Sequence, residues 1–101
     1  MFYSFGNLLN IKRYLDPSSS FSWGTNPNDS WVYFKEKEFE SIFYLNKNGK
    51  IRSICFWDTG DGHARYVDHN NPENINVLLE AKELNLKLKE WILFNLDSIY
   101  F

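Results

Sequence analysis

The segment formed by residues 56–71, FWDTGDGHARYVDHNN, holds the largest concentration of side chains in this chain that could do chemistry. It contains three aspartates and two histidines, and two glycines lie among them. Carboxylates and imidazoles are common proton-transfer groups and metal ligands, whereas aspartate and glycine are also ordinary turn residues. The segment is therefore a catalytic or metal-binding loop, a recognition surface, or a turn between two strands.

The triplet Asp58-Thr59-Gly60 resembles the aspartic protease triplet, and the chain length resembles that of a retroviral-type protease subunit. That chemistry needs two carboxylates that share one proton. The chain departs from the protease pattern because its triplet lies past the middle, no glycine-rich flap follows, and a helix replaces the last strands. The sequence does not favour a protease.

A metal site or a metal-free hydrolase would use the carboxylates and imidazoles of the same segment. The candidate metal ligands are Asp58, Asp61, His63, Asp68 and His69. Their spacing matches neither the His-Glu-x-x-His motif nor an EF-hand loop, so no metal or other cofactor is expected. His63 with Asp61 could act as a general base, but no nucleophile motif accompanies the pair. A small hydrolytic or nuclease-like enzyme that uses Asp58, Asp61, His63 and His69 remains the alternative.

A recognition surface is the interpretation that the segment favours most. Tryptophan and tyrosine side chains anchor protein interfaces, and neighbouring acids attract a basic partner. The predicted partner-binding residues are Trp57, Asp58, Asp61, His63, Tyr66 and Asp68, with Trp23 and Trp31 as secondary members. The run KEKEFE adds Glu36, Glu38 and Glu40, but its interspersed lysines are more typical of a solvated surface.

The aromatic content supports this interpretation. Phenylalanine, tyrosine and tryptophan make up 19% of the chain, with nine Phe, six Tyr and four Trp. This amount of ring surface exceeds what the core of so small a domain can enclose. We therefore expect some rings to face a partner, although a core built from rings would give the same composition.

Length, charge and cysteine content limit the function further. With 101 residues, the chain is expected to form a single domain, residues 1–101. Its formal charge is −2 and its basic residues are dispersed, which argues against nucleic-acid binding. One cysteine, Cys55, precludes an internal disulfide and fits a reducing cytoplasm. The chain shows no secretion signal and no apolar stretch of about 20 residues, so we expect a cytoplasmic protein that binds no membrane.

The predicted elements define an α+β fold. A short helix is expected within residues 5–15, because apolar residues recur at helical spacing up to Asp16-Pro17. A loop rich in Ser, Asn, Pro and Gly covers residues 16–29. Aromatic and β-branched residues then predict strands at Ser30–Glu36, Phe39–Leu45 and residues 50–58, with a fourth short strand within residues 63–69.

The turn at Asn48-Gly49 predicts an antiparallel hairpin with a two-residue type I′ connection. The resulting register pairs Lys47 with Lys50, Leu45 with Arg52, Phe43 with Ile54, and Ser41 with Phe56. One face then carries Phe39, Phe43, Leu45, Ile54 and Phe56, and the other carries Ile42, Tyr44, Ile51, Cys55 and Trp57. Both faces are apolar, so the face that no helix covers needs the long loop or another protein against it.

A long C-terminal helix is predicted from the cap-like sequence Asn71-Pro72-Glu73 to about Asn95. At 100° per residue one stripe packs on the sheet, formed by Val77, Ala81, Leu84, Leu88, Trp91 and Ile92. Ile75, Leu79 and Leu86 lie on nearly the opposite side. They contact the first helix or they lie in an interface, and Leu79 with Leu86 would then be buried in a self-associating structural module.

The predicted fold is thus an antiparallel sheet of three to four strands, with a short N-terminal helix and a long C-terminal helix packed on one face. In its shortness, acidic balance, aromatic and Asn-rich character, hairpin sheet and closing helix, the chain resembles the small bacterial immunity proteins and antitoxins. The resemblance implies a cytoplasmic protein, monomeric when free, that binds one basic cognate toxin. Such toxins are often nucleases delivered by a neighbouring cell, and the immunity protein blocks the active site. Those families share no fixed binding residues, so the resemblance assigns no role to any residue here.

Overall fold

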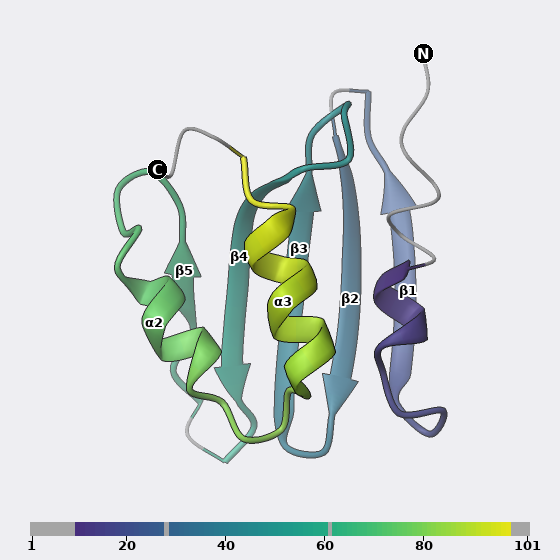
Figure 1. Ribbon diagram of the computed structural model, residues 1–101, viewed down its shortest axis with the longest axis vertical. Helices are drawn as coiled ribbons and strands as arrows, with labels where there is room; N and C mark the ends of the chain where they lie inside the picture. The colour runs from purple at the N-terminus through teal and green to yellow at the C-terminus, as the bar shows by residue number, and fades with distance from the viewer. Residues whose placement is uncertain (1–9, 28, 61, 98–101) are drawn as a thin grey trace.

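The computed structural model describes residues 10–27, 29–60 and 62–97, which form one sheet with helices on one of its faces (Figure 1). Residues 10–13 are helical, as predicted for the helix within residues 5–15, and the part of that prediction at residues 5–9 lies outside the described residues. The elements that follow are β1 (Ser20–Thr25), β2 (Ser30–Glu36), β3 (Phe39–Leu45), β4 (Ile51–Asp58), β5 (Arg65–Val67), α2 (Asn74–Leu79) and α3 (Leu86–Phe94). The α+β class and the placement of helices on one face are as the sequence predicts.

The sheet is a five-stranded antiparallel meander in which each strand pairs with the next along the chain, in the order β1-β2-β3-β4-β5. The predicted three to four strands were too few, because part of the expected loop at residues 16–29 forms β1. This segment pairs antiparallel with β2, with Phe21 opposite Phe34 and Trp23 opposite Val32. Phe21 and Trp23 alternate with the small residues Ser22 and Gly24, which matches the two-residue period of a strand. The pairing with β2 therefore makes this segment a strand despite its loop-like composition.

The β3–β4 hairpin confirms part of the predicted register and corrects the rest. Phe43 pairs with Ile54 and Ser41 with Phe56, as predicted, whereas Leu45 pairs with Ile51 instead of Arg52. The connection is longer than two residues, since Asn46 N–H bonds to the Lys50 carbonyl and Gly49 N–H to the Asn46 carbonyl. Gly49 has a φ of 77°. The predicted pairing of Lys47 with Lys50 is therefore wrong.

A shift of register between Tyr44 and Leu45 accompanies this longer turn. It places an extra residue, Arg52, in β4 and turns Ile51 toward the helices, where Ile51 is fully buried. The prediction that Ile51 lies on the face away from the helices is wrong for that reason. A further contact fixes this end of β4, because Ile51 forms an isolated parallel bridge with Leu96.

The predicted long C-terminal helix is two helices, with a break between Leu79 and Leu86. Asn85 begins the second helix from an extended conformation, and its side chain accepts a hydrogen bond from Leu88 N–H at 2.8 Å. The break changes the helical phase, so Leu78 is buried in α2 while Val77 is 39% exposed. The predicted stripe is therefore wrong at Val77. It is confirmed on α3, where Leu88, Trp91 and Ile92 are buried, whereas Leu84 is buried but lies in the break between the two helices.

The core lies between the sheet and the helices and is rich in rings. Phe43 is fully buried, with its ring centroid 5.2 Å from that of Phe34 and 6.5 Å from that of Trp91. A polar pair also lies in the sheet, where the Ser41 hydroxyl donates to the Cys55 carbonyl at 3.2 Å. Across the described ranges, none of the helices has the length and apolar character that crossing a bilayer requires.

Candidate functional site

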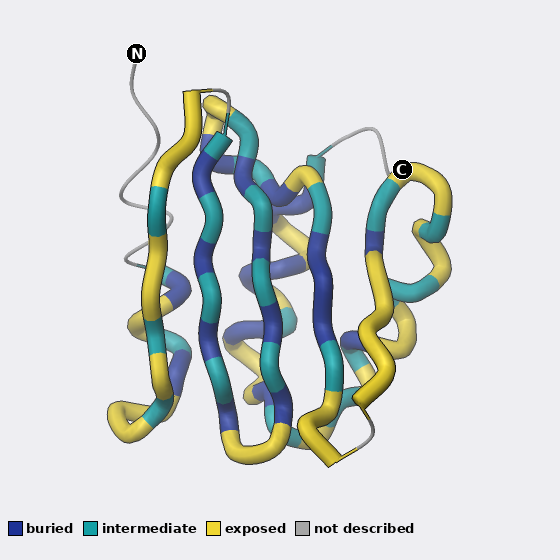
Figure 2. The backbone as a smooth tube through the Cα atoms, turned by 180° about the vertical axis from the view of Figure 1, so that it is seen from behind, coloured by how far each residue is buried: buried dark blue, intermediate teal, exposed yellow. Residues whose placement is uncertain are grey.

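The side of the sheet opposite the helices carries a broad group of large side chains. Figure 2 shows the strands in front and the helices behind them, so within the described ranges no helix lies over this side. We call it the open face. Its members on β2 to β5 are Trp31, Tyr33, Lys35, Glu40, Ile42, Tyr44, Ser53, Cys55, Trp57 and Tyr66. Along β2 and β3 they alternate with buried core residues, which is the period of two expected for a half-exposed sheet.

The strand register arranges these side chains in three rows across the sheet. The rows are Lys35–Glu40–Trp57, Tyr33–Ile42–Cys55–Tyr66 and Trp31–Tyr44–Ser53. Directly opposed residues in an antiparallel sheet have Cβ atoms about 4.5–5.5 Å apart, so neighbours in a row touch. Five of the ten side chains in these rows are therefore tyrosine or tryptophan, and the carboxylate among the ten is that of Glu40 in the first row.

The Glu40 carboxylate is the centre of a hydrogen-bond network on the open face. Its Oε1 accepts from the Tyr33 hydroxyl at 2.7 Å. Its Oε2 accepts from Trp57 Nε1 at 2.9 Å and from the Thr59 hydroxyl at 2.8 Å. Three donors from two strands and the segment after β4 therefore hold one anion in a fixed position.

This network changes the acidity of both Glu40 and Tyr33. The hydrogen bonds from Tyr33 and Thr59 lower the pKa of Glu40 below its ordinary value, and the positive charge of Lys35 acts in the same direction. The same bond raises the pKa of Tyr33 to about 12, with burial and the charge of Glu40 as further causes. Glu40 is therefore ionised and Tyr33 is neutral over the whole physiological range.

A second polar contact lies in the middle row. The Cys55 thiol is buried, and burial raises its pKa, while a hydrogen bond with the Tyr66 side chain acts in the opposite direction. Tyr66 is 52% exposed and its own pKa is raised, chiefly by the same bond. Tyr66 thus presents its ring to solvent while its hydroxyl interacts with the sheet.

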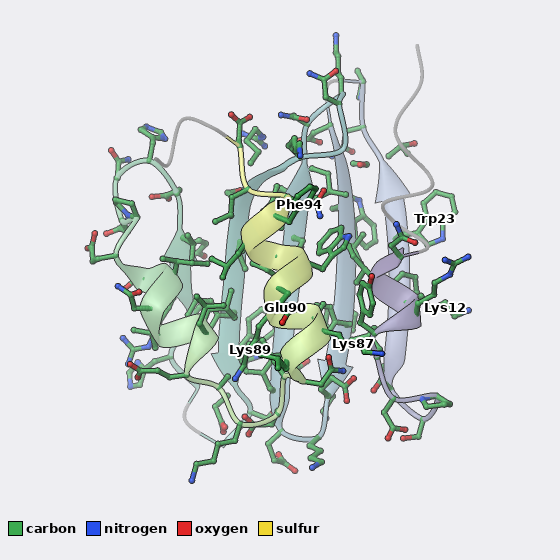
Figure 3. All side chains as sticks on the ribbon, viewed as in Figure 1. Lys12, Trp23, Lys87, Lys89, Glu90 and Phe94 are labelled. Carbon is green, nitrogen blue, oxygen red and sulfur yellow. The ribbon has the colours of Figure 1, made fainter. Side chains whose placement is uncertain are left out.

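The structure divides the predicted partner-binding residues among three places. Trp57, Tyr66 and Trp31 lie together on the open face. Trp23 lies on the helix-bearing side (Figure 3), because it pairs with Val32, which is buried in the core. The Trp23 side chain is 47% exposed. Asp58 is the last residue of β4, His63 precedes β5, and Asp68 and His69 follow it, while Asp61 lies outside the described residues.

The aspartates of this segment stabilise turns. The Asp58 carboxylate accepts a hydrogen bond from Gly60 N–H at 2.9 Å. The Asp68 carboxylate accepts from the backbone N–H groups of Asn70 and Asn71 at 3.0 Å and 2.9 Å. These are the local side-chain-to-backbone bonds that favour aspartate in turns. Glu40, in contrast, is hydrogen-bonded to the Tyr33 and Trp57 side chains.

Trp31 has a specific support on the neighbouring strand. Gly24 pairs with Trp31 across β1 and β2, and a Cβ atom at Gly24 would lie 2.6 Å from the Trp31 ring. The indole therefore lies against the backbone of β1, which only glycine permits. This contact fixes the outer end of the third row of the open face.

The residues of the alternative enzyme site partly meet at one cavity. A cavity of about 190 Å³ at the end of β4 is lined by both Asp58 and His63, with Arg65 and Val77 beside them. His69 is exposed and does not line that cavity. Among residues 10–27, 29–60 and 62–97, no group of three His, Cys, Asp or Glu side chains is placed to hold a metal ion.

The residues proposed for self-association lie on the helix-bearing side. Leu86 at the start of α3 is 70% exposed. Phe94, at the other end of α3 (Figure 3), is 80% exposed. Leu79 is partly buried. The helix-bearing side therefore exposes large apolar side chains of its own, whereas the rings of the open face other than Tyr66 are half-buried and lie side by side along the strands.

Sequence reasoning missed the central residue of the open face. Glu40 was grouped with a solvated charged run, whereas in the structure Glu36 is buried, Glu38 is exposed and Glu40 bonds to two rings. The alternation of side chains along the strand indicates the position of Glu40, since residues two apart share a face and Glu40 lies two residues before Ile42.

Comparison of the chain with protein-family models, curated proteins and solved structures finds no match.

Proposed function

We propose that this chain is a stoichiometric protein-binding inhibitor whose open face covers a basic surface of its target. In its specific form the proposal is an immunity protein, or antitoxin, that neutralises a cognate bacterial toxin such as a nuclease by occluding the active site. The protein then works in the cytoplasm without a cofactor and without catalysing a reaction. It contacts neither nucleic acid nor membrane.

The continuous ring surface of the open face is the observation that supports this proposal. Large contiguous apolar patches are unusual on monomeric proteins and mark interaction sites. Tryptophan, tyrosine and arginine dominate the binding energy of protein interfaces, and rings with polar tips suit surfaces that are wet in the free state. The open face carries two tryptophans and three tyrosines on four adjacent strands, namely Trp31, Trp57, Tyr33, Tyr44 and Tyr66.

Charge supports the choice of a basic target. The chain has a formal charge of −2, and the carboxylate of the open face is held ionised among rings. A negative site in a desolvated aromatic surface gains most from a cation on the partner. A toxin that acts on nucleic acid carries such cations at its active site, because it must neutralise phosphates.

The test compares matched variants in binding and in protection. The wild-type chain is used to capture its partner from the native host, and the captured chain is identified and produced as a separate protein. We expect Trp57→Ala and Tyr44→Ala to reduce affinity for that partner at least tenfold, whereas Phe94→Ala on α3 leaves it unchanged. In cells that express the partner, growth should be restored by the wild type and by Phe94→Ala, but not by the two open-face variants.

Two outcomes would refute the proposal. The first is a captured partner whose binding is lost with Phe94→Ala and kept with both open-face variants. The second is a partner whose toxicity or activity is the same with and without saturating amounts of this chain.

The cavity at the end of β4 favours a second candidate, a small hydrolytic enzyme. Asp58 and His63 both line it, as general acid–base chemistry would require. This candidate predicts turnover of an ester, phosphodiester or peptide substrate by the purified chain alone. It further predicts that Asp58→Asn and His63→Ala each abolish that turnover, whereas the inhibitor proposal predicts no turnover at all.

A further inference from the structure

The first row of the open face supports an inference about how a partner is recognised, and this inference rests on the proposed function. We propose that Glu40, together with the rings of Trp57 and Tyr33, binds an arginine side chain of the partner. The arginine donates to the Glu40 carboxylate and stacks its guanidinium plane on an adjacent ring.

The hydrogen bonds of Glu40 leave room for one further donor. A carboxylate offers about four acceptor positions, two on each oxygen. Oε2 accepts from Trp57 and Thr59, and Oε1 accepts from Tyr33. One position on Oε1 is left for a donor from outside the chain. An incoming cation therefore meets an anion whose position is already fixed, so little ordering entropy is lost on binding.

The rings that hold the carboxylate also provide the stacking surface. Trp57 Nε1 and the Tyr33 hydroxyl both touch the carboxylate, so each ring lies directly beside the anion. A cation near the Glu40 oxygens is consequently within reach of both rings, and tryptophan gives the strongest cation–π attraction. Arginine fits this arrangement better than lysine, because a planar guanidinium stacks on a ring while it donates in its own plane.

The neighbouring charges define the direction of approach. Lys35 lies opposite Glu40 on β2, and Trp57 lies opposite Glu40 on β4. Lys35 repels a cation, so the arginine approaches over β4, on the Trp57 side. At the same end of the sheet, Glu38 and Asp58 are exposed and add negative potential, which exposed Lys37 partly offsets.

A pair of isosteric probes tests the inference without any variant. The full chain, labelled with ¹⁵N, is titrated with N-acetyl-arginine amide and separately with N-acetyl-citrulline amide, which has the same shape but no charge. We expect the indole Nε1–H signal of Trp57 and the amide signal of Thr59 to shift with the arginine probe at millimolar concentration. The citrulline probe should shift them less than one fifth as far.

Charge variants provide the matched controls. Glu40→Gln keeps the side-chain size and an acceptor, and should remove the response to the arginine probe. Lys35→Gln removes the repelling charge, and should strengthen binding of the probe about two- to threefold at low salt. Equal responses to the arginine and citrulline probes, or an unchanged response in Glu40→Gln, would overturn the inference. An equal response to N-acetyl-lysine amide would overturn the choice of arginine.

The same variants separate this inference from the proposed function. With the captured partner, Glu40→Gln should weaken binding at least tenfold, because the partner's arginine then lies buried without its counter-charge. If Trp57→Ala disrupts the complex and Glu40→Gln does not, the arginine site is wrong and the open face still binds the partner. If neither variant has an effect, both proposals fail. Light scattering tests whether the chain dimerises through this face. If the wild type has the mass of a dimer and Trp57→Ala has the mass of a monomer, a second copy occupies the face and the inference is overturned.

Discussion

The bond between Tyr33 and Glu40 gives a prediction that requires no partner. The phenol pKa of Tyr33 is raised from 10.0 to about 12, and the hydrogen bond to Glu40 is the largest cause. Glu40→Gln replaces the anionic acceptor with a neutral one of nearly the same shape. We expect the pKa of Tyr33 to return most of the way to its ordinary value, because only the contribution of burial remains.

The size of the effect follows from the titration curve. At pH 11 a phenol with a pKa of about 12 is roughly one tenth ionised, whereas a phenol with its ordinary pKa of about 10 is roughly nine tenths ionised. A pKa difference of about two between the unfolded and the folded chain corresponds to about 2.7 kcal/mol of free energy. Because the Tyr33 ring is partly exposed, solvent screening reduces the contribution to the free energy of unfolding to about 1–2 kcal/mol. Because the folded pKa is the higher one, this stability is present below pH 10 and is lost as the pH rises toward 12.

The measurement is a pH titration of the chain with tyrosine labelled at the ¹³Cζ position, which resolves each phenol by NMR. Tyr33 should titrate last in the wild type and at least one unit earlier in Glu40→Gln. Glu38→Gln removes the same charge from an exposed position and should leave Tyr33 unchanged. The reasoning is refuted if Tyr33 of the folded wild type ionises near pH 10, or if the two variants behave alike.

Further predictions concern stability and association. Phe43→Ala removes a fully buried ring and should lower the free energy of unfolding by about 3–5 kcal/mol in urea titrations, whereas Phe94→Ala should change it by less than about 0.5 kcal/mol. Gly24→Ala should displace the Trp31 indole and lower the free energy of unfolding by about 1–3 kcal/mol. The displacement should change the tryptophan fluorescence spectrum, and an unchanged spectrum would contradict the close contact. Asp68→Ala removes the hydrogen bonds to the backbone N–H groups of Asn70 and Asn71, and should lower the free energy of unfolding in urea by about 1 kcal/mol. The affinity for the partner should be unchanged. Light scattering of the chain alone should give the mass of a monomer.

Sequence patterns predicted the central strands because their residues alternate clearly. Ser30–Glu36 and Phe39–Leu45 form strands with the predicted bounds. β1 was missed because the composition of residues 16–29 favours a loop, and the alternation of Phe21 and Trp23 with small residues indicates a strand only once β2 is beside it. The helix break at residues 80–85 was missed because Asn85 can lie within a helix or cap one, and tertiary packing decides between the two.

The candidate site was predicted in its ring content but not in its arrangement. The alternation of residues along the strands predicts Ile42, Tyr44 and Trp57 on one face, and the structure confirms that grouping. Composition could not separate acids that stabilise turns from the acid that faces the rings. That distinction depends on the strand register, because Glu40 meets Trp57 only when β3 and β4 pair as they do.

The meander order of the sheet has a consequence for how the chain folds. Every strand pairs with its immediate successor, so each step closes a short loop, and chains rich in such local contacts fold quickly. Hairpins of this kind can form in order as the polypeptide leaves the ribosome. The bridge between Ile51 and Leu96 joins residues far apart in the chain, as do the hydrogen bonds from the Asn46 side chain to Asp97 and from the Asn85 side chain to the Tyr14 carbonyl. Closure of that bridge is therefore expected to be a late step in folding, after synthesis of the sheet is complete.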